Sequence, residues 1–346
     1  MINNIITSLN NSLEEKGTHI QFNDSSYKPI KLSKENFHEI KTIKSNQRIA
    51  FIDGGNTEIL KAPNFSLQLI RIYLTIYQNN KRIDSKKIEF YILINAINQE
   101  ESITYKTQFF GIDKEIVKFD SFDKTIRQGQ HRISISSIGN VIRRFTELET
   151  AKNITAELEN NDIIILDGDL KSSITNEIDY LNRLYEKAIK KNITIAAISK
   201  TSELFTEKGN ALIPILNELS PKEEWYYHPL VKIENQNHKA DIYILKLNKN
   251  SKHTFKFEIS NKTKYKIDEI LSILKENSKD PVFLGYPYGL IEADNFARVS
   301  NKEKDYLMTI FLTKLGKNNE KIAQYLNTSN SHNILDSISY WPNTVN

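Results

Sequence analysis

Asp162-Ile-Ile-Ile-Leu-Asp-Gly-Asp169 is a short apolar run that ends in a carboxylate and a glycine. A segment with helical periodicity follows at residues 173–191, and Ile193-Thr-Ile-Ala-Ala-Ile-Ser199 is a second apolar run. A buried strand, a helix and another buried strand at this spacing predict a βαβ unit, in which the two strands are parallel. An α/β fold is therefore the expectation for this part of the chain.

A second run of the same kind, Arg48-Ile-Ala-Phe-Ile-Asp-Gly-Gly55, ends at Asp53. We expect each Asp-Gly pair to close a short strand as a turn, with the acid at the edge of the sheet, because glycine lets backbone and ligand come close there. Asp-Gly is also ordinary turn chemistry, and this alternative stays open. Two such acids on separate strands, with carboxylates on an intervening helix, offer the oxygen ligands that one or two Mg²⁺ or Mn²⁺ ions need.

The segments around the two runs predict the rest of the architecture. Residues 48–53, 66–77 and 87–97 are rich in Ile, Leu and Tyr with stretches of alternation, which favours an antiparallel meander. Residues 140–159 carry apolar side chains at intervals of three and four, as in a helix with one buried face. Three meander strands, a helix, and then alternating strands and helices is the element order of the ribonuclease H-like fold.

The expected fold class is therefore α/β, a ribonuclease H-like mixed sheet flanked by helices. Residues 222–260 predict an additional β-rich insertion, residues 301–346 a helical C-terminal extension, and residues 1–44 an N-terminal lead-in. The sequence has no internal repeat, no low-complexity linker and no sharp break in composition. We expect a single elaborated domain over residues 1–346, with its core at about 45–300.

Composition narrows the chemistry. The chain has no cysteine, which excludes disulfides, thiolate metal sites and cysteine nucleophiles, and its seven histidines show no close metal-ligand spacing. Any metal must be held mostly by oxygen. A basic leader and an apolar run of membrane-spanning length are both missing, so we expect a cytoplasmic protein that does not enter a membrane. The net charge of +4 supports an acidic partner only weakly.

The chain resembles the NurA family of archaeal and bacterial DNA-end nucleases. The resemblance covers roughly residues 45 to 300 and depends on four motifs that stand in the family's order. They are Ile52-Asp-Gly-Gly55, a helical glutamate about eighteen residues before Leu166-Asp-Gly-Asp-Leu170, Ile198-Ser-Lys-Thr-Ser202, and Gly285-Tyr-Pro-Tyr-Gly-Leu-Ile-Glu-Ala-Asp294.

This resemblance implies a manganese-dependent nuclease (Mn²⁺ or Mg²⁺) that degrades single-stranded DNA and resects duplex ends in the 5′ to 3′ direction for recombinational repair. It also implies a homodimer that works with a HerA-like hexameric ATPase, the family's translocase. Carried over by position, Asp53 and Asp167 match metal-binding aspartates, and Glu149 or Glu147 matches the family's helical glutamate. Tyr286 matches an active-site tyrosine.

Asp294 stands where the family often has histidine. An additional carboxylate can ligate a metal directly, but it cannot do the proton work of a neutral imidazole, so the general acid or base is left open. The expected metal ligands are Asp53, Asp167, Asp294 and a helical glutamate. Glu147 and Glu149 lie on opposite flanks of the apolar stripe of their helix, and the sequence does not choose between them.

Two other residues complete the candidate site. Lys200 follows the second βαβ strand, where it could neutralise the scissile phosphate, or it could be a solvated lysine at a strand end. Tyr286 could stack on a base or position a phosphate, or it could belong to a packed turn.

Two alternatives from other classes remain. Asp167-Gly-Asp169, with Ser199 on the next strand, looks like the motif of haloacid dehalogenase-type phosphatases. That motif normally opens its domain, whereas roughly 160 residues precede it here, and this reading leaves Asp53 without a role. A catalytically silent module that only docks onto a DNA translocase would leave the acids apart in space.

Overall fold

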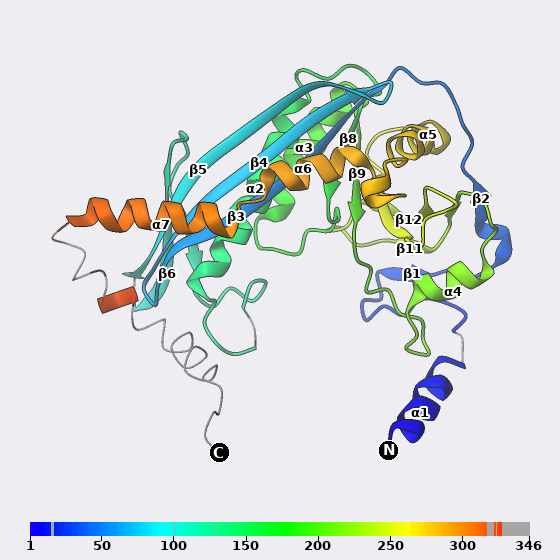
Figure 1. Ribbon diagram of the computed structural model, residues 1–346, viewed down its shortest axis with the longest axis horizontal. Helices are drawn as coiled ribbons and strands as arrows, with labels where there is room; N and C mark the ends of the chain where they lie inside the picture. Colours follow the sequence, from blue (N-terminus) through cyan, green and yellow to red (C-terminus); the bar gives the residue numbers. More distant parts are fainter. Residues whose placement is uncertain (15–16, 100, 128, 317–321, 323, 327–346) are drawn as a thin grey trace, which may run out of the picture. The chain divides into compact units, whose positions relative to one another are not determined.

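The structure of the chain is a computed structural model that describes residues 1–14, 17–99, 101–127, 129–316, 322 and 324–326 (Figure 1). Two compact units are distinguished by their internal contacts, and three strands and two helices contribute residues to both of them. The first unit comprises residues 1–53, 74–86 and 147–295, and the second comprises residues 54–73, 87–146 and 296–346.

The bounds of the elements are as follows. The helices are α1 (Ile2–Glu14), α2 (Ile138–Ile154), α3 (Glu177–Lys190), α4 (Leu212–Leu219), α5 (Ile267–Asn277), α6 (Tyr288–Ala297) and α7 (Asn301–Leu315), with short 3₁₀ helices at Lys34–Asn36, Ile135–Ser137 and Pro281–Phe283. The strands are β1 (Tyr27–Pro29), β2 (Phe37–Glu39), β3 (Arg48–Ala62), β4 (Phe65–Gln78), β5 (Lys81–Gln99), β6 (Ser102–Phe110), β7 (Val117–Asp120), β8 (Ile163–Asp167), β9 (Thr194–Ser199), β10 (Trp225–Tyr227), β11 (Val231–Ile233), β12 (Ala240–Lys246) and β13 (Phe255–Ser260).

The predicted βαβ unit is present as β8, α3 and β9. Strands β8 and β9 pair in parallel, with Ile165 opposite Ala196, and β3 pairs in parallel with the other edge of β8. Both strands are apolar and buried along most of their length because neighbouring strands and helices cover them. Helix α3 buries Leu181, Leu184 and Ala188, which are spaced as one helical face requires.

The strands form one eleven-stranded hydrogen-bonded sheet and a separate two-stranded pair, β1 with β11. The order of the large sheet is β2-β10-β12-β13-β9-β8-β3-β4-β5-β6-β7. Strands β10, β12 and β13 of the predicted β-rich insertion therefore continue the large sheet beyond β9, with which β13 pairs in the antiparallel sense, whereas β11 of the same region belongs to the two-stranded pair. Strands β3, β4 and β5 are neighbours joined by two-residue turns, as an antiparallel meander requires.

One local expectation was wrong. Asp53-Gly54-Gly55 is not a turn, because β3 continues through it to Ala62. A side chain on Gly55 would place its Cβ 2.3 Å from the carbonyl oxygen of Ala297, so the glycine permits a close backbone approach rather than a reversal of the chain. At the second motif the expectation holds, since β8 ends at Asp167 and Gly168 adopts a φ of 105°.

The two ends of the chain match the predicted outline in part. The N-terminal lead-in contains α1 and then the short strands β1 and β2. The C-terminal extension is helical at α7, and residues 317–321, 323 and 327–346 of the predicted extension lie outside the described residues. No helix in the part of the chain that the structure describes is both long and apolar enough to span a bilayer.

The first unit has an apolar core between the sheet and the helices α5 and α6. Phe51, Phe257, Leu271 and Tyr286 are buried in it, and Gly289 of α6 packs directly against the ring of Phe51. A Cβ on Gly289 would come within 2.0 Å of that ring, so only glycine lets α6 approach β3 this closely. This contact fixes the position of α6 relative to the first half of β3.

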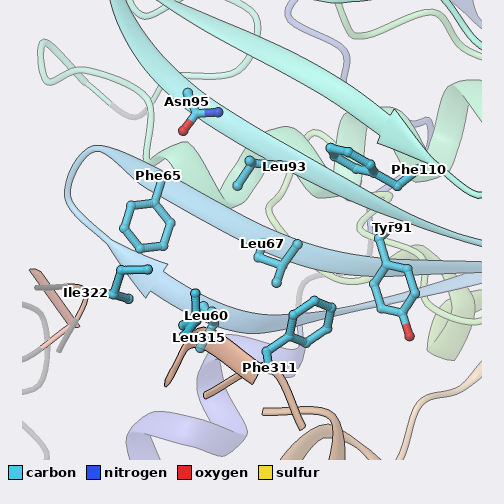
Figure 2. A pocket seen from close by; sticks show the side chains of 10 residues that line it. All are labelled: Leu60, Phe65, Leu67, Tyr91, Leu93, Asn95, Phe110, Phe311, Leu315 and Ile322. Carbon is cyan, nitrogen blue, oxygen red and sulfur yellow. The ribbon is translucent and has the colours of Figure 1, made fainter. Parts of the chain in front are cut away.

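The second unit has its own apolar cluster and an open apolar pocket of about 510 Å³ (Figure 2). The pocket is lined by Leu60, Phe65, Leu67, Tyr91, Leu93, Asn95, Phe110, Phe311, Leu315 and Ile322. In the same unit Arg71 is buried and pairs with Glu89 and Glu303, while its Nη1 donates to the carbonyl oxygen of Arg298 at 3.0 Å. Helix α7 is thus held to the strands by both apolar and ionic contacts.

Candidate metal centre

Three of the predicted acids meet in the first unit. Asp53 lies on β3, Asp167 is the last residue of β8, and Asp294 lies on α6. Each offers one carboxylate oxygen, and these three oxygens lie within 4.8 Å of one another. The parallel register explains the first pair, because Ile52 is opposite Leu166 and the next residues along the two strands are the two aspartates.

The end of β8 is tied to β9 by two hydrogen bonds. The backbone N–H of Gly168 donates to the carbonyl oxygen of Ile198 at 2.9 Å, and the hydroxyl of Ser199 donates to the carbonyl oxygen of Gly168 at 2.6 Å. These bonds fix the backbone on the C-terminal side of Asp167. Asp294 reaches the same place because α6 packs closely on β3.

Lys200 inserts its ammonium group among the three aspartates. Its Nζ lies 2.8 Å from Asp294 Oδ1, 2.9 Å from Asp167 Oδ2 and 3.9 Å from Asp53 Oδ2. Burial alone would lower the pKa of Lys200, but the charge of Asp167 and the hydrogen bonds to Asp294 and Asp167 outweigh it and raise this pKa above its usual value. The lysine is therefore charged throughout the neutral range.

Tyr286 is buried beside the same carboxylates. Its hydroxyl donates to Asp167 Oδ1 at 3.4 Å, and its ring stacks on Phe283 with centroids 5.2 Å apart. Burial, followed by the charges of Asp167 and Asp53, raises the pKa of the Tyr286 hydroxyl above its usual value. The hydroxyl therefore stays protonated and acts as a hydrogen-bond donor toward the acidic group.

The pattern of the NurA domain matches residues 47–299 of this sequence. The chain belongs to the NurA family. It is similar over 92% of its length to the NurA nuclease from Sulfolobus solfataricus, of which 95% is covered, with a TM-score of 0.55 and 15% sequence identity. This likeness, together with the mixed sheet and its flanking helices, confirms the predicted fold class.

Two endonuclease V structures are more distant. The enzyme from Ciona intestinalis, solved with DNA, has a TM-score of 0.39 at 10% identity, with 77% of this chain and 89% of that chain covered. The catalytic domain of human endonuclease V has a TM-score of 0.38 at 9% identity, with 80% of this chain and 92% of that chain covered. A search of curated protein sequences finds no match.

The two helical glutamates predicted from the NurA resemblance lie on α2 and are not equivalent. Glu147 is buried, whereas Glu149 is partly exposed and accepts a hydrogen bond from Lys152 Nζ at 3.1 Å. Among the described residues, neither belongs to the group of acids whose oxygens lie within 4.8 Å of one another. Asp169 is outside this group as well. A glutamate ligand therefore remains a prediction.

Glu258 was not predicted from the sequence, and it holds the backbone that follows Asp167. This fully buried carboxylate on β13 accepts hydrogen bonds from the backbone N–H of Leu170 and from Lys256 Nζ, both at 2.8 Å, and its Oε2 lies 3.0 Å from His238 Nε2. Burial would raise the pKa of Glu258, but His238 and Lys256 lower it to about 2. The only signal in the sequence was a pair of opposite charges at alternate positions of an apolar strand.

The donor set matches a hard divalent cation. Three carboxylates from three separate elements provide oxygen ligands, which Mg²⁺ and Mn²⁺ prefer, and the chain has no thiolate to favour a softer metal. In the structure, the ammonium of Lys200 lies within hydrogen-bond distance of two of these three carboxylates.

Proposed function

We propose that this chain is a metal-dependent deoxyribonuclease that cleaves phosphodiester bonds at the Asp53, Asp167 and Asp294 cluster. One observation carries the proposal, namely that carboxylates from β3, β8 and α6 converge within 4.8 Å in a chain of the NurA family. The similar protein from Sulfolobus solfataricus is a nuclease, which supports the same activity. A purely docking module would not need this convergence.

The residues that would hold the metal are Asp53, Asp167 and Asp294, with Glu147 or Glu149 as a further ligand. Mn²⁺ or Mg²⁺ bound there would lower the pKa of a water molecule to make the nucleophile and would stabilise the leaving oxygen. Asp53 is held by the backbone of a central strand, and Asp167 by the bonded end of β8. These two aspartates therefore form a rigid base for the site.

Lys200 and Tyr286 supply the neighbouring polar groups. The ammonium of Lys200 is charged at neutral pH and is suited to neutralise a phosphate oxygen near the acids. The hydroxyl of Tyr286 is a protonated donor in a buried position, which favours a role in orienting Asp167 or a phosphate oxygen over a role as a base. Asp294 stands where histidine is frequent in the family, so a carboxylate takes the place of an imidazole at this position.

The proposed substrates are single-stranded DNA and duplex ends, in a cytoplasmic pathway of DNA end resection for recombinational repair. A homodimer and a HerA-like hexameric ATPase are the proposed partners. A protein that binds long DNA by itself needs many basic residues to contact many phosphates. The net charge of this chain is only +4, which favours a partner that binds the long DNA. Exposed apolar residues such as Ile2, Ile5 and Ile6 of α1, each at least 50% exposed, offer a docking surface.

The decisive experiment is a cleavage assay with end-labelled single strands and blunt duplexes in Mn²⁺, in Mg²⁺ and in EDTA. We expect cleavage with either metal and loss of cleavage in EDTA. Asp169→Asn is the matched control, since Asp169 lies beside the site but outside the acidic group; this variant should retain nuclease activity. A phosphatase of the haloacid dehalogenase type would instead lose its activity in this variant and would hydrolyse a phosphomonoester.

Partnership is tested separately by co-purification and size-exclusion chromatography with the cognate ATPase. A protein that stays monomeric, ignores the ATPase and degrades long duplexes processively would contradict the proposed division of labour. The assignment of the acidic site would be unaffected by that result.

A further inference from the structure

Lys200 lies among the three acids of the candidate metal centre. Its ammonium faces the carboxylates themselves, with two charge-assisted hydrogen bonds of 2.8 and 2.9 Å to Asp294 and Asp167 and a third acid, Asp53, at 3.9 Å. These are the same three residues whose oxygens form the candidate metal ligands. The lysine therefore pairs with the carboxylates that, under the proposed function, bind a divalent ion.

The two cations cannot use this charge independently. A divalent ion that took the same oxygen of Asp294 at a ligand distance of about 2.1 Å would lie within about 5 Å of a nitrogen that is 2.8 Å from that oxygen. At such a separation, in a partly buried site, the two positive charges repel each other strongly. Binding of the ion must therefore weaken the contacts of Lys200.

We propose that Lys200 is an internal cation that competes with the divalent ion for Asp53, Asp167 and Asp294. The inference rests on the proposed function and adds that Lys200 leaves the carboxylates when the ion binds, which directs its ammonium toward a DNA phosphate. Its side chain is 36% exposed and has four methylene groups, so the head can move outward while the backbone stays in place.

Competition has two consequences for the protein without DNA. The ammonium offsets the mutual repulsion of three carboxylates, so the metal-free fold keeps this site at a modest net charge. The same ammonium lowers the affinity of the site for divalent ions. Removing the ammonium should therefore lower the stability of the metal-free protein and raise its affinity for divalent ions. A purely structural lysine would not produce these two opposite effects together.

The test is calorimetric titration of the DNA-free protein with MnCl₂ and with MgCl₂. We expect Lys200→Met to bind the ion about tenfold or more tightly than the wild type, and Lys200→Arg to stay close to the wild type because it keeps the charge. Lys279→Met is the matched control, since it removes the same charge from an exposed pair with Glu276 on α5 and should not change the affinity. In EDTA the Lys200→Met protein should also melt below the wild type.

A second measurement requires no variant. Acetylation of Lys200 by an amine-reactive reagent, followed by mass spectrometry of the wild-type protein, should increase when Mn²⁺ is added, because the amine is released from the carboxylates. Equal or weaker metal binding by Lys200→Met, or lower acetylation of Lys200 in Mn²⁺, would overturn the inference while the metal site survives. Absence of metal binding in the wild type and in every variant would overturn the proposed function as well.

Discussion

The two Asp-Gly segments share one pattern, an apolar run followed by Asp-Gly, and have different structures. At Asp53 the chain passes straight through Gly54 and Gly55 as part of a fifteen-residue strand, whereas at Asp167 the strand ends and Gly168 turns with a φ of 105°. Yet both carboxylates reach the same point. The parallel register of β3 and β8 therefore brings the two acids together, and the contacts of each strand decide whether the chain turns after its aspartate.

The two acids are also held in different ways. Asp53 is fixed by backbone hydrogen bonding in a strand that lies between β8 and β4. Asp167 stands at a strand end, where Tyr286 contacts its carboxylate, Ser199 holds the following glycine and Glu258 holds the N–H of Leu170. Substitutions at the supporting residues should therefore affect the Asp167 side of the site selectively.

The largest effect is expected from neutralising either acid. Asp53→Asn and Asp167→Asn should each reduce cleavage of single-stranded DNA in Mn²⁺ by about a thousandfold or more, because each removes an anionic ligand from a metal-dependent site. The melting temperature of each metal-free variant should equal or exceed that of the metal-free wild type, since one of three like charges is removed. The rise should be larger for Asp53→Asn, because Asp167 makes the closer contact with Lys200. Full activity in either variant would contradict the assignment.

A smaller effect is expected from Glu258→Gln. This variant tests the contribution of the buried carboxylate that holds the backbone after Asp167. The variant leaves the partly buried Lys256 without its counter-charge and should lower the free energy of unfolding by about 3 kcal/mol at pH 7. Because the pKa of Glu258 is lowered to about 2, its stabilisation is complete above about pH 4.3, the value of an unfolded glutamate, and is lost as the pH falls toward 2.

Urea unfolding at pH 7 and pH 3 measures this difference. The gap between the wild type and Glu258→Gln should narrow at pH 3. Glu234→Gln is the control, because Glu234 is exposed with its partners Lys28 and Lys232 and should matter little. A gap that is the same at both pH values would argue against a charged Glu258.

The smallest effects are expected at the glycines themselves. Gly55→Ala should cost about 2 kcal/mol, because its Cβ would press on the backbone carbonyl of Ala297 at 2.3 Å. Gly168→Ala should cost about 1 kcal/mol from its positive φ alone, since no atom lies within 4 Å of the added carbon. Chemical denaturation of both variants measures these losses of stability. A larger loss in Gly168→Ala than in Gly55→Ala would contradict the prediction.

Periodicity allowed the central part of the fold to be predicted. The apolar runs around Ile165 and Ile195 and the helical face of α3 are local signals, and parallel pairing then brings Asp53 and Asp167 together. The continuation of β3 beyond Gly55 was not predictable in this way. It depends on pairing with β4 and on the approach of Ala297, which are contacts between residues far apart in the sequence.

Long-range contacts also position the rest of the candidate site, and they could not be predicted from the sequence. The sequence identified Asp294 and Lys200 as candidates, but the fit of Gly289 on Phe51, which positions α6, has no local signature. Glu258 was missed because its strand alternates like any half-buried strand. The sequence could not reveal that its charged face is covered by the segment that follows Asp167.

The buried pairing of Arg71 limits how the chain can be shortened. The NurA match ends at residue 299, but Arg71 relies on Glu303 of α7, and Phe311 of the same helix packs against the apolar cluster that includes Leu67. A protein trimmed to the matched range would keep a buried guanidinium with one of its two carboxylates removed and would uncover an apolar sheet face to water. We therefore expect such a fragment to be less stable than the full chain and to aggregate, because the family's sequence pattern stops before a helix on which the buried residues of the second unit depend.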